Sequence, residues 1–146
     1  MALAAVAVVA FVTIGRAQQP EGDAPATGSL RVAIDYKGAG TVDADHRVWV
    51  WVFDTPNITG ESIPISTGVV KENSGSYKFV GLPKDVYLAV AYDTKGGYDG
   101  TSGPPPTGTP VSIYGVTTPG GPAGAVTTGG DDAKVTVTFD DSNKMR

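Results

Sequence analysis

The segment Val48–Phe53 constrains the fold of this chain more than any other stretch. It alternates valine with aromatic residues, in the order VWVWVF, and is followed by Asp54-Thr55-Pro56. Because successive side chains of a strand point to opposite faces, the valines share one face and the aromatic side chains share the other. The ring of Pro56 cannot donate a ladder hydrogen bond and ends the pairing. The pattern therefore predicts a central strand that is covered on both faces.

Further segments carry apolar residues at every second position, which is the period of a strand. These segments span residues 29–36, 63–70, 77–79, 86–92, 111–114 and 135–139. Turn residues separate them, and Gly 20 and Pro 11 among 146 residues fit short strands joined by tight turns. We expect one all-β domain over residues 29–146, an antiparallel seven-stranded sandwich of the Ig-like or transthyretin-like kind.

One connection in this domain is unusually long. Residues 94–130 contain eleven glycines and six prolines and only one of the expected strands. Loops of this length are either functional or poorly ordered. The composition leaves open whether this loop is irregular but ordered on the domain.

The first 17 residues are predicted to be a signal peptide or a membrane anchor. Residues 1–14 are almost wholly apolar, and Gly15 and Ala17 fit the small residues before a signal-peptidase cut. Fifteen residues in a helix would reach only about 22 Å, less than the ~30 Å hydrocarbon core of a bilayer. Cleavage before Gln18 and retention as an anchor both remain open.

Residues 18–28 are polar, contain proline and glycine, and are expected to be a linker. We therefore expect the domain to be periplasmic or extracellular. Residues 1–15 would associate it with the membrane if they are retained.

The charge and the lack of cysteine exclude several classes of function. The net charge is −4 and the basic residues form no cluster. Such a chain lacks the phosphate-neutralising groups that nucleic-acid binding needs. Cysteine is absent, which excludes disulfide bonds and thiolate metal sites. We expect no cofactor.

A seventeen-residue stretch carries the pattern Tyr77-x-Phe79-x-Gly81-Leu82-Pro83-x-x-x-Tyr87-x-x-x-Ala91-Tyr92-Asp93. This stretch resembles the carboxypeptidase regulatory-like and transthyretin-like sandwiches of secreted bacterial proteins. The likeness covers residues 29 to 140. It implies an accessory module used in adhesion, ligand binding or assembly, without catalytic residues.

The sequence contains few residues that could act together as a general acid, a general base or a nucleophile. His46 is the only histidine, and although Asp43, Asp45 and Asp54 lie near it, no serine in a nucleophile-elbow pattern accompanies them. A zinc site would need more nitrogen or sulfur ligands than the chain has. We expect that the protein is not an enzyme.

Asp93 and Asp99 are weak candidates for a calcium site. They bracket a glycine-rich segment after a predicted strand, where carboxylate and carbonyl oxygens could gather. Lys95 stands where a further acceptor would be needed, and no glutamate closes the loop. A glycine-rich turn with solvated acidic side chains is the favoured interpretation.

The candidate ligand or partner contacts are Trp49, Trp51, Tyr98 and Tyr114. On an open face the two tryptophans would form a stacking platform, whereas on a two-sided apolar strand they belong to the core. The favoured hypothesis is a non-catalytic extracytoplasmic structural or interaction module. It would be an extrinsic accessory subunit that docks on a membrane-associated complex through the long loop. The alternative is a carbohydrate- or small-ligand-binding module that uses exposed aromatic side chains.

Overall fold

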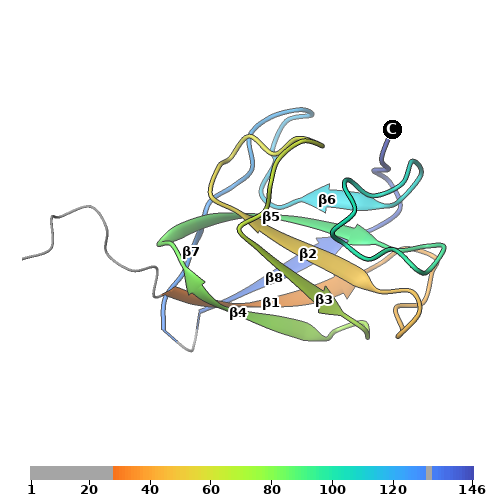
Figure 1. Ribbon diagram of the computed structural model, residues 1–146, viewed down its shortest axis with the longest axis horizontal. Coiled ribbons are helices and arrows are strands. Elements are labelled where there is room, and N and C mark those ends of the chain that lie inside the picture. The colour runs from red at the N-terminus through yellow and green to blue at the C-terminus, as the bar shows by residue number, and fades with distance from the viewer. Residues whose placement is uncertain (1–27, 131–132) are drawn as a thin grey trace, which may run out of the picture.

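The computed structural model describes residues 28–130 and 133–146 (Figure 1). The predicted signal peptide or anchor at residues 1–17 lies outside the described residues, as does the predicted linker up to residue 27. Gly28, assigned to that linker from the sequence, is instead the first residue of a strand. No helix in the described part is long and apolar enough to cross a membrane.

The described residues form strands and no helices, so the domain is all-β as predicted. The strands are β1 (Gly28–Tyr36), β2 (Val48–Phe53), β3 (Ser66–Val70), β4 (Ser76–Leu82), β5 (Asp85–Tyr92), β6 (Val111–Ile113), β7 (Val126–Thr127) and β8 (Lys134–Phe139).

The strands form two sheets that pack face to face. One sheet has the order β4-β1-β8, and the other has the order β3-β2-β5-β6, with β7 paired to β5 as well. Figure 1 shows the two layers crossing, with β1, β4 and β8 on one side and β2, β3 and β5 on the other. The arrangement is that of a β-sandwich.

The structure differs from the predicted seven antiparallel strands in two respects. It has an eighth strand, β7, which lies inside the predicted loop at 94–130. β6 pairs only with Ala89–Ala91, so the first residues of β5 have no partner from β6. Val126 of β7 pairs there with Val86.

The second difference is that β1 and β8 are parallel, from Arg31 opposite Lys134 to Tyr36 opposite Phe139. The chain crosses to the start of β1 at the Ser29–Gly129 bridge and then runs alongside it. This crossing gives β8 the direction of β1.

The third strand also begins later than predicted. The sequence places it from residue 63, but β3 starts at Ser66, and Ile63 and Ile65 are 84% and 44% exposed. Pro64 between them has no N–H to donate to a ladder. The alternating isoleucines therefore belong to the loop after β2.

The predicted burial of β2 on both faces is confirmed. Val48, Val50 and Val52 are fully buried between the two sheets, where they join Val32 and Ile34 of β1 in the main core. Burial of each such side chain contributes about 1.5–3 kcal/mol.

The aromatic face of β2 belongs to a second, smaller apolar cluster on the outer side of the β3-β2-β5-β6 layer. Loops cover that cluster, instead of a second sheet. The tryptophans are thus core residues, but the core to which they belong is covered by loops.

Candidate functional site

The outer face of the β3-β2-β5-β6 layer has a hollow because small side chains flank a large one. Across the strands, Trp51 stands opposite Thr67 on one side and Ala89 on the other, and Ala89 stands opposite Ile113. Residues directly opposite each other in a sheet have neighbouring side chains. The indole of Trp51 therefore rises between two short side chains, and space remains beside it.

Two loops from opposite ends of the sheet cover this hollow. Residues 54–65 follow β2, and residues 93–110 follow β5, which runs antiparallel to β2. They meet above the sheet, where a Cβ placed on Gly60 would lie 3.9 Å from the Cβ of Pro104. The hollow is thereby closed into a partly roofed cleft.

The loop after β5 is fixed to the sheet by the two tryptophans. The Trp51 indole Nε1 donates to the Gly100 carbonyl oxygen at 3.1 Å. Gly100 has a positive φ of 73°, and a side chain there would overlap the Trp49 indole. This close approach requires a glycine.

Tyr98 adds a second attachment. Its ring packs edge-on against Trp49 and Trp51, with centroids 5.9 Å and 6.2 Å away. Its hydroxyl donates to the Gly103 carbonyl oxygen at 2.5 Å. Burial, followed by the nearby carboxylates of Asp99 and Asp93, raises the pKa of Tyr98 above its ordinary value.

The space enclosed by these elements is a cleft of about 600 Å³, here called the outer-face cleft. Trp51, Thr67, Ala89 and Ile113 form its floor. Its walls come from the two loops and the C-terminal tail, and they are mainly apolar. The wall residues include Ile58, Glu61, Ile63, Pro64, Pro104, Pro105 and Met145.

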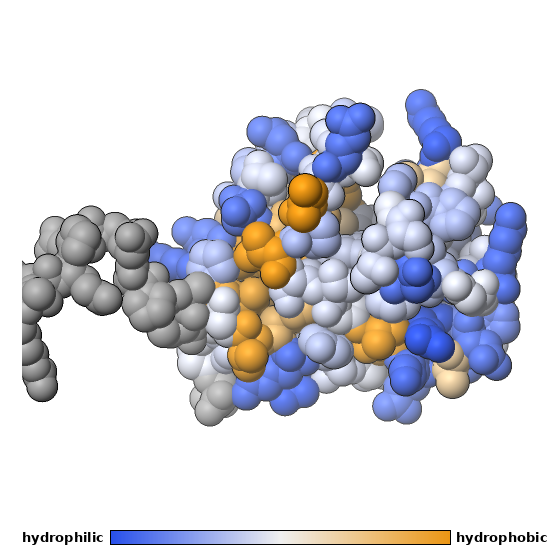
Figure 2. All heavy atoms as spheres, in the orientation of Figure 1, coloured by the Kyte–Doolittle hydropathy of each residue, from blue (hydrophilic) through white to orange (hydrophobic). Residues whose placement is uncertain are grey.

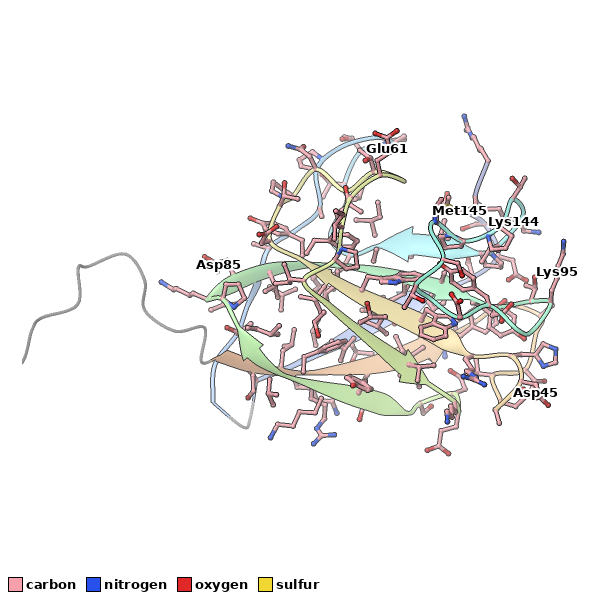
Figure 3. All side chains as sticks on the ribbon, viewed as in Figure 1. Asp45, Glu61, Asp85, Lys95, Lys144 and Met145 are labelled. Atoms are coloured by element: carbon pink, nitrogen blue, oxygen red, sulfur yellow. The ribbon has the colours of Figure 1, made fainter. Side chains whose placement is uncertain are left out.

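Glu61 is the one charged residue among those that line the outer-face cleft. Figure 3 shows Glu61 on the loop after β2 and Met145 near the C-terminus. Figure 2 shows a few apolar groups, in orange, among mainly polar neighbours on the side of the molecule in view. The cleft is therefore suited to an apolar group rather than to a highly charged one.

The structure brings together three of the four predicted contact residues. Trp49 and Trp51 are 9% and 8% exposed and pack with Tyr98, so neither indole is an open stacking platform. Tyr114 lies apart from them: it packs against the core between the sheets, and its N–H donates to the Leu88 carbonyl oxygen.

The Trp49 indole N–H is buried and has no hydrogen-bond partner in the described part of the chain. This orphan donor fits the interpretation of Trp49 as a packing residue. Its ring supports the loop at Gly100 instead of presenting a polar group to a ligand.

The two calcium candidates organise the loop itself. The Asp93 carboxylate is buried and accepts the backbone N–H groups of Gly96 and Tyr98 at 3.0 Å and 2.9 Å. Asp99 accepts the N–H groups of Thr101 and Ser102, both at 2.9 Å.

Asp99 also accepts the Ser102 hydroxyl, and this bond, with the backbone ones, lowers the pKa of Asp99 to about 2. Figure 3 shows Lys95 pointing away from the loop into solvent. Within residues 28–130 and 133–146, no three acidic or histidine side chains are grouped as a metal would need.

His46 lies in an exposed turn at the same end of the molecule. Its Nδ1 is 3.0 Å from the Asp43 carboxylate, which also accepts the backbone N–H of His46 at 2.7 Å. These bonds lower the pKa of Asp43, the backbone bond most. The pair closes the turn that leads into β2.

A third polar arrangement joins the C-terminal tail to β1. The Tyr36 hydroxyl donates to the Asp141 carboxylate, and the ring of Tyr36 stacks on Tyr92 with centroids 4.4 Å apart. Burial, and then the bond to Asp141, raises the pKa of Tyr36. The Ala39 N–H and then Tyr36 lower the pKa of Asp141.

Comparisons with protein-family models, with curated proteins and with solved structures found no match to this chain. The resemblance to carboxypeptidase regulatory-like and transthyretin-like domains therefore stays a prediction.

Sequence reasoning missed the residues that make the outer-face cleft. The walls come from Gly60 and Pro104, which lie far apart in the sequence and meet only in the fold. One signal could have been used: Ile63 and Ile65 flank Pro64, so two apolar side chains fall in a segment that cannot be a regular strand.

Proposed function

We propose that this protein is a non-catalytic interaction module that acts outside the cytoplasm. It would serve as an accessory subunit that docks on a membrane-associated complex. The apolar segment at residues 1–14 supports the location, and the small number of acid–base groups supports a non-catalytic role.

The observation that carries the proposal is the outer-face cleft with its exposed apolar rim. Ile63 lines the cleft yet is 84% exposed, and Ile65 nearby is 44% exposed. Exposed apolar groups around a hollow are typical of surfaces that another protein covers. We propose that an apolar side chain of a protein partner enters the cleft and that Ile63 packs against the partner's surface.

Site-specific photo-cross-linking in the native host tests this proposal. A photoreactive phenylalanine derivative replaces Ile63 in one variant. In the control it replaces Val80, which is 70% exposed on β4 of the other sheet. We expect a discrete cross-linked protein, identified by mass spectrometry, from position 63 and not from position 80.

A cleft-filling variant makes the test specific. Ala89→Leu places extra volume on the cleft floor and should weaken the cross-link from position 63. Identical cross-links from both positions, or a cross-link that persists at full strength in Ala89→Leu, would contradict docking through this cleft.

A second candidate function is the binding of a small apolar molecule. The cleft volume of about 600 Å³ supports it, because small-molecule sites commonly have volumes of roughly 300–1,000 Å³. Native mass spectrometry of the protein from its host should then show a bound non-protein mass. The same measurement on Ala89→Leu should show the protein alone.

A further inference from the structure

β8 is an edge strand whose outward backbone groups have no backbone partner among the described residues. An open edge strand presents unpaired N–H and C=O groups that can pair with another chain. The two sheets have five such edge strands, namely β3, β4, β6, β7 and β8, of which β7 has only two residues.

Two of these edges carry features that oppose extension. The tail covers β6, since the Val111 N–H donates to the Asn143 carbonyl oxygen and Pro110 is bridged to Lys144. The ladder of β4 with β1 shifts register near Gly28, and Gly81 of β4 has a positive φ of 68°.

β8 contains no proline or glycine and pairs only with β1 among the described strands. The backbone bonds to β1 come from its odd-numbered residues: Ala133 and Phe139 accept the N–H groups of Arg31 and Lys37. In a strand, successive residues direct their backbone groups to opposite edges. Thr136 and Thr138 therefore direct their N–H and C=O groups away from β1.

The outer side chains of β8 are exposed. Lys134, Thr136 and Thr138 are exposed, and Val135 on the inner face is only partly buried against the main core. A polar hollow of about 250 Å³ separates the end of β8, at Thr138 and Asp140, from Val111 and Ser112 of β6 and Asn143 of the tail.

The sequence of this edge is complementary to itself. If two copies of β8 pair antiparallel about a twofold axis at Val137, Lys134 stands opposite Asp140, and Thr136 stands opposite Thr138. Pairs of threonines and of opposite charges are favourable across strands. On the inner face, the partly buried Val135 would stand opposite Phe139 of the other copy.

In this register the outward N–H and C=O groups of β8 also find hydrogen-bond partners. It sets even-numbered residues opposite even-numbered residues, so the outward groups of Thr136 meet those of Thr138 in a hydrogen-bonded pair. Val137 falls in a pair without hydrogen bonds, as its inward-directed backbone groups require.

We propose that two copies of this protein associate through β8 and join their three-stranded sheets into one six-stranded sheet. The pairing is isologous, because the same surface is used by both copies. It is independent of the outer-face cleft, which lies on the other sheet.

Sedimentation of the full chain over micromolar to millimolar concentrations tests the association. We expect a reversible monomer–dimer equilibrium that Thr136→Pro abolishes, because proline removes an outward N–H and leaves the bonds to β1 intact. Circular dichroism establishes that this variant is folded. A chain that stays monomeric throughout, or a dimer that survives Thr136→Pro, would overturn the proposal.

Charge reversal tests the register without altering the backbone. Lys134→Glu sets two acidic side chains opposite each other and should raise the dissociation constant at least tenfold at low salt. Asp140→Lys should act similarly, and the double variant should restore the wild-type constant. If the double variant stays as weak as the single ones, the register is wrong.

Cysteine cross-linking provides a direct check, since the chain has no cysteine of its own. A mixture of Thr136→Cys and Thr138→Cys chains should form a disulfide-linked pair under mild oxidation. Each variant alone should form far less. Equal cross-linking in all three samples, or cross-linking only to a different protein in the host, would refute self-pairing at this edge.

Discussion

Gly100 is the residue at which the loop after β5 comes closest to the sheet. Its carbonyl oxygen accepts the Trp51 indole N–H, and its Cα lies against the Trp49 ring. A positive φ and the absence of a side chain are both needed there. The roof of the outer-face cleft therefore depends on a glycine at this position.

Substitution of this glycine tests that dependence. Gly100→Ala should lower the free energy of unfolding by about 2–5 kcal/mol, the sum of the left-handed backbone and the overlap with Trp49. Gly97 is the matched control, because its φ is 81° and nothing lies within 4 Å of the added carbon. Gly97→Ala should lose only about 1–2 kcal/mol in urea denaturation. Equal losses in the two variants would show that the contact with Trp49 contributes nothing.

Trp51 combines packing with a hydrogen bond, and the two contributions can be separated. Trp51→Ala should cost about 3–5 kcal/mol in chemical denaturation, as for other buried aromatic residues. Trp51→Phe keeps much of the packing but leaves the Gly100 carbonyl oxygen without its donor, and should cost less. A loss below about 1 kcal/mol for Trp51→Ala would mean that its side chain is at the surface.

At the scale of elements, the loop that follows β5 is organised by its own carboxylates. Asp93 is buried and binds two backbone N–H groups, and Asp99 does the same in the next turn. The two carboxylates hold the loop backbone in place, which is the role that a bound ion has in a metal-binding loop. The loop can therefore be ordered by the chain alone.

Adding calcium distinguishes a loop ordered by its own carboxylates from a loop ordered by a bound metal ion. We expect the same melting temperature in millimolar calcium and in chelator, because the oxygens of Asp93 are already used by backbone donors. Asp93→Ala should cost about 1–3 kcal/mol, since it leaves buried N–H groups unsatisfied. A rise of the melting temperature with calcium that disappears in Asp93→Asn would instead establish a metal site.

The strands differ in how far their sequence predicts them. β2 could be predicted with its burial, because the VWVWVF alternation is local and both of its faces are apolar. The start of β3 could not, because Ile63 and Ile65 have strand propensity but Pro64 breaks the ladder. The pairing of β8 with β1 depends on where the chain crosses at Gly129, far along the sequence.

The outer-face cleft was less predictable than any strand. Trp51 could be singled out from its position on β2, but the hollow beside it exists because Thr67 and Ala89 are its neighbours on other strands. Those neighbours are fixed by register, which no local pattern specifies. The meeting of Gly60 with Pro104 likewise follows from the whole fold.

For the whole molecule, the shifted pKa values predict a plateau of stability that falls at both extremes of pH. The pKa values of Asp43, Asp99, Asp140 and Asp141 are lowered by hydrogen bonds in the folded state. Such groups stabilise the fold above their unfolded pKa of about 4. That contribution is lost as the pH falls towards the folded value, which is about 2 for Asp99.

Tyrosines set the alkaline limit. Burial raises the pKa values of Tyr36, Tyr92 and Tyr98, so the folded state keeps their protons more firmly than the unfolded state does. Their contribution is complete below the unfolded pKa of about 10 and is lost above it.

Unfolding in urea measured from pH 2 to 12 should therefore show a plateau between about pH 4 and 10. Asp99→Asn should make the loss of stability at acid pH shallower. Tyr36→Phe should make the loss of stability at alkaline pH shallower. Unchanged slopes in both variants would contradict the assignment of these groups.

The parallel pairing of β1 with β8 has a mechanical consequence. β1 starts at Gly28 and β8 ends at Phe139, so a pull on the two ends of the domain draws these neighbouring strands along each other. The bonds between them are then loaded together and must break at once, whereas a hairpin opened from its end loses them one at a time. A domain tethered at one end and held by a partner at the other would resist tension through this single ladder.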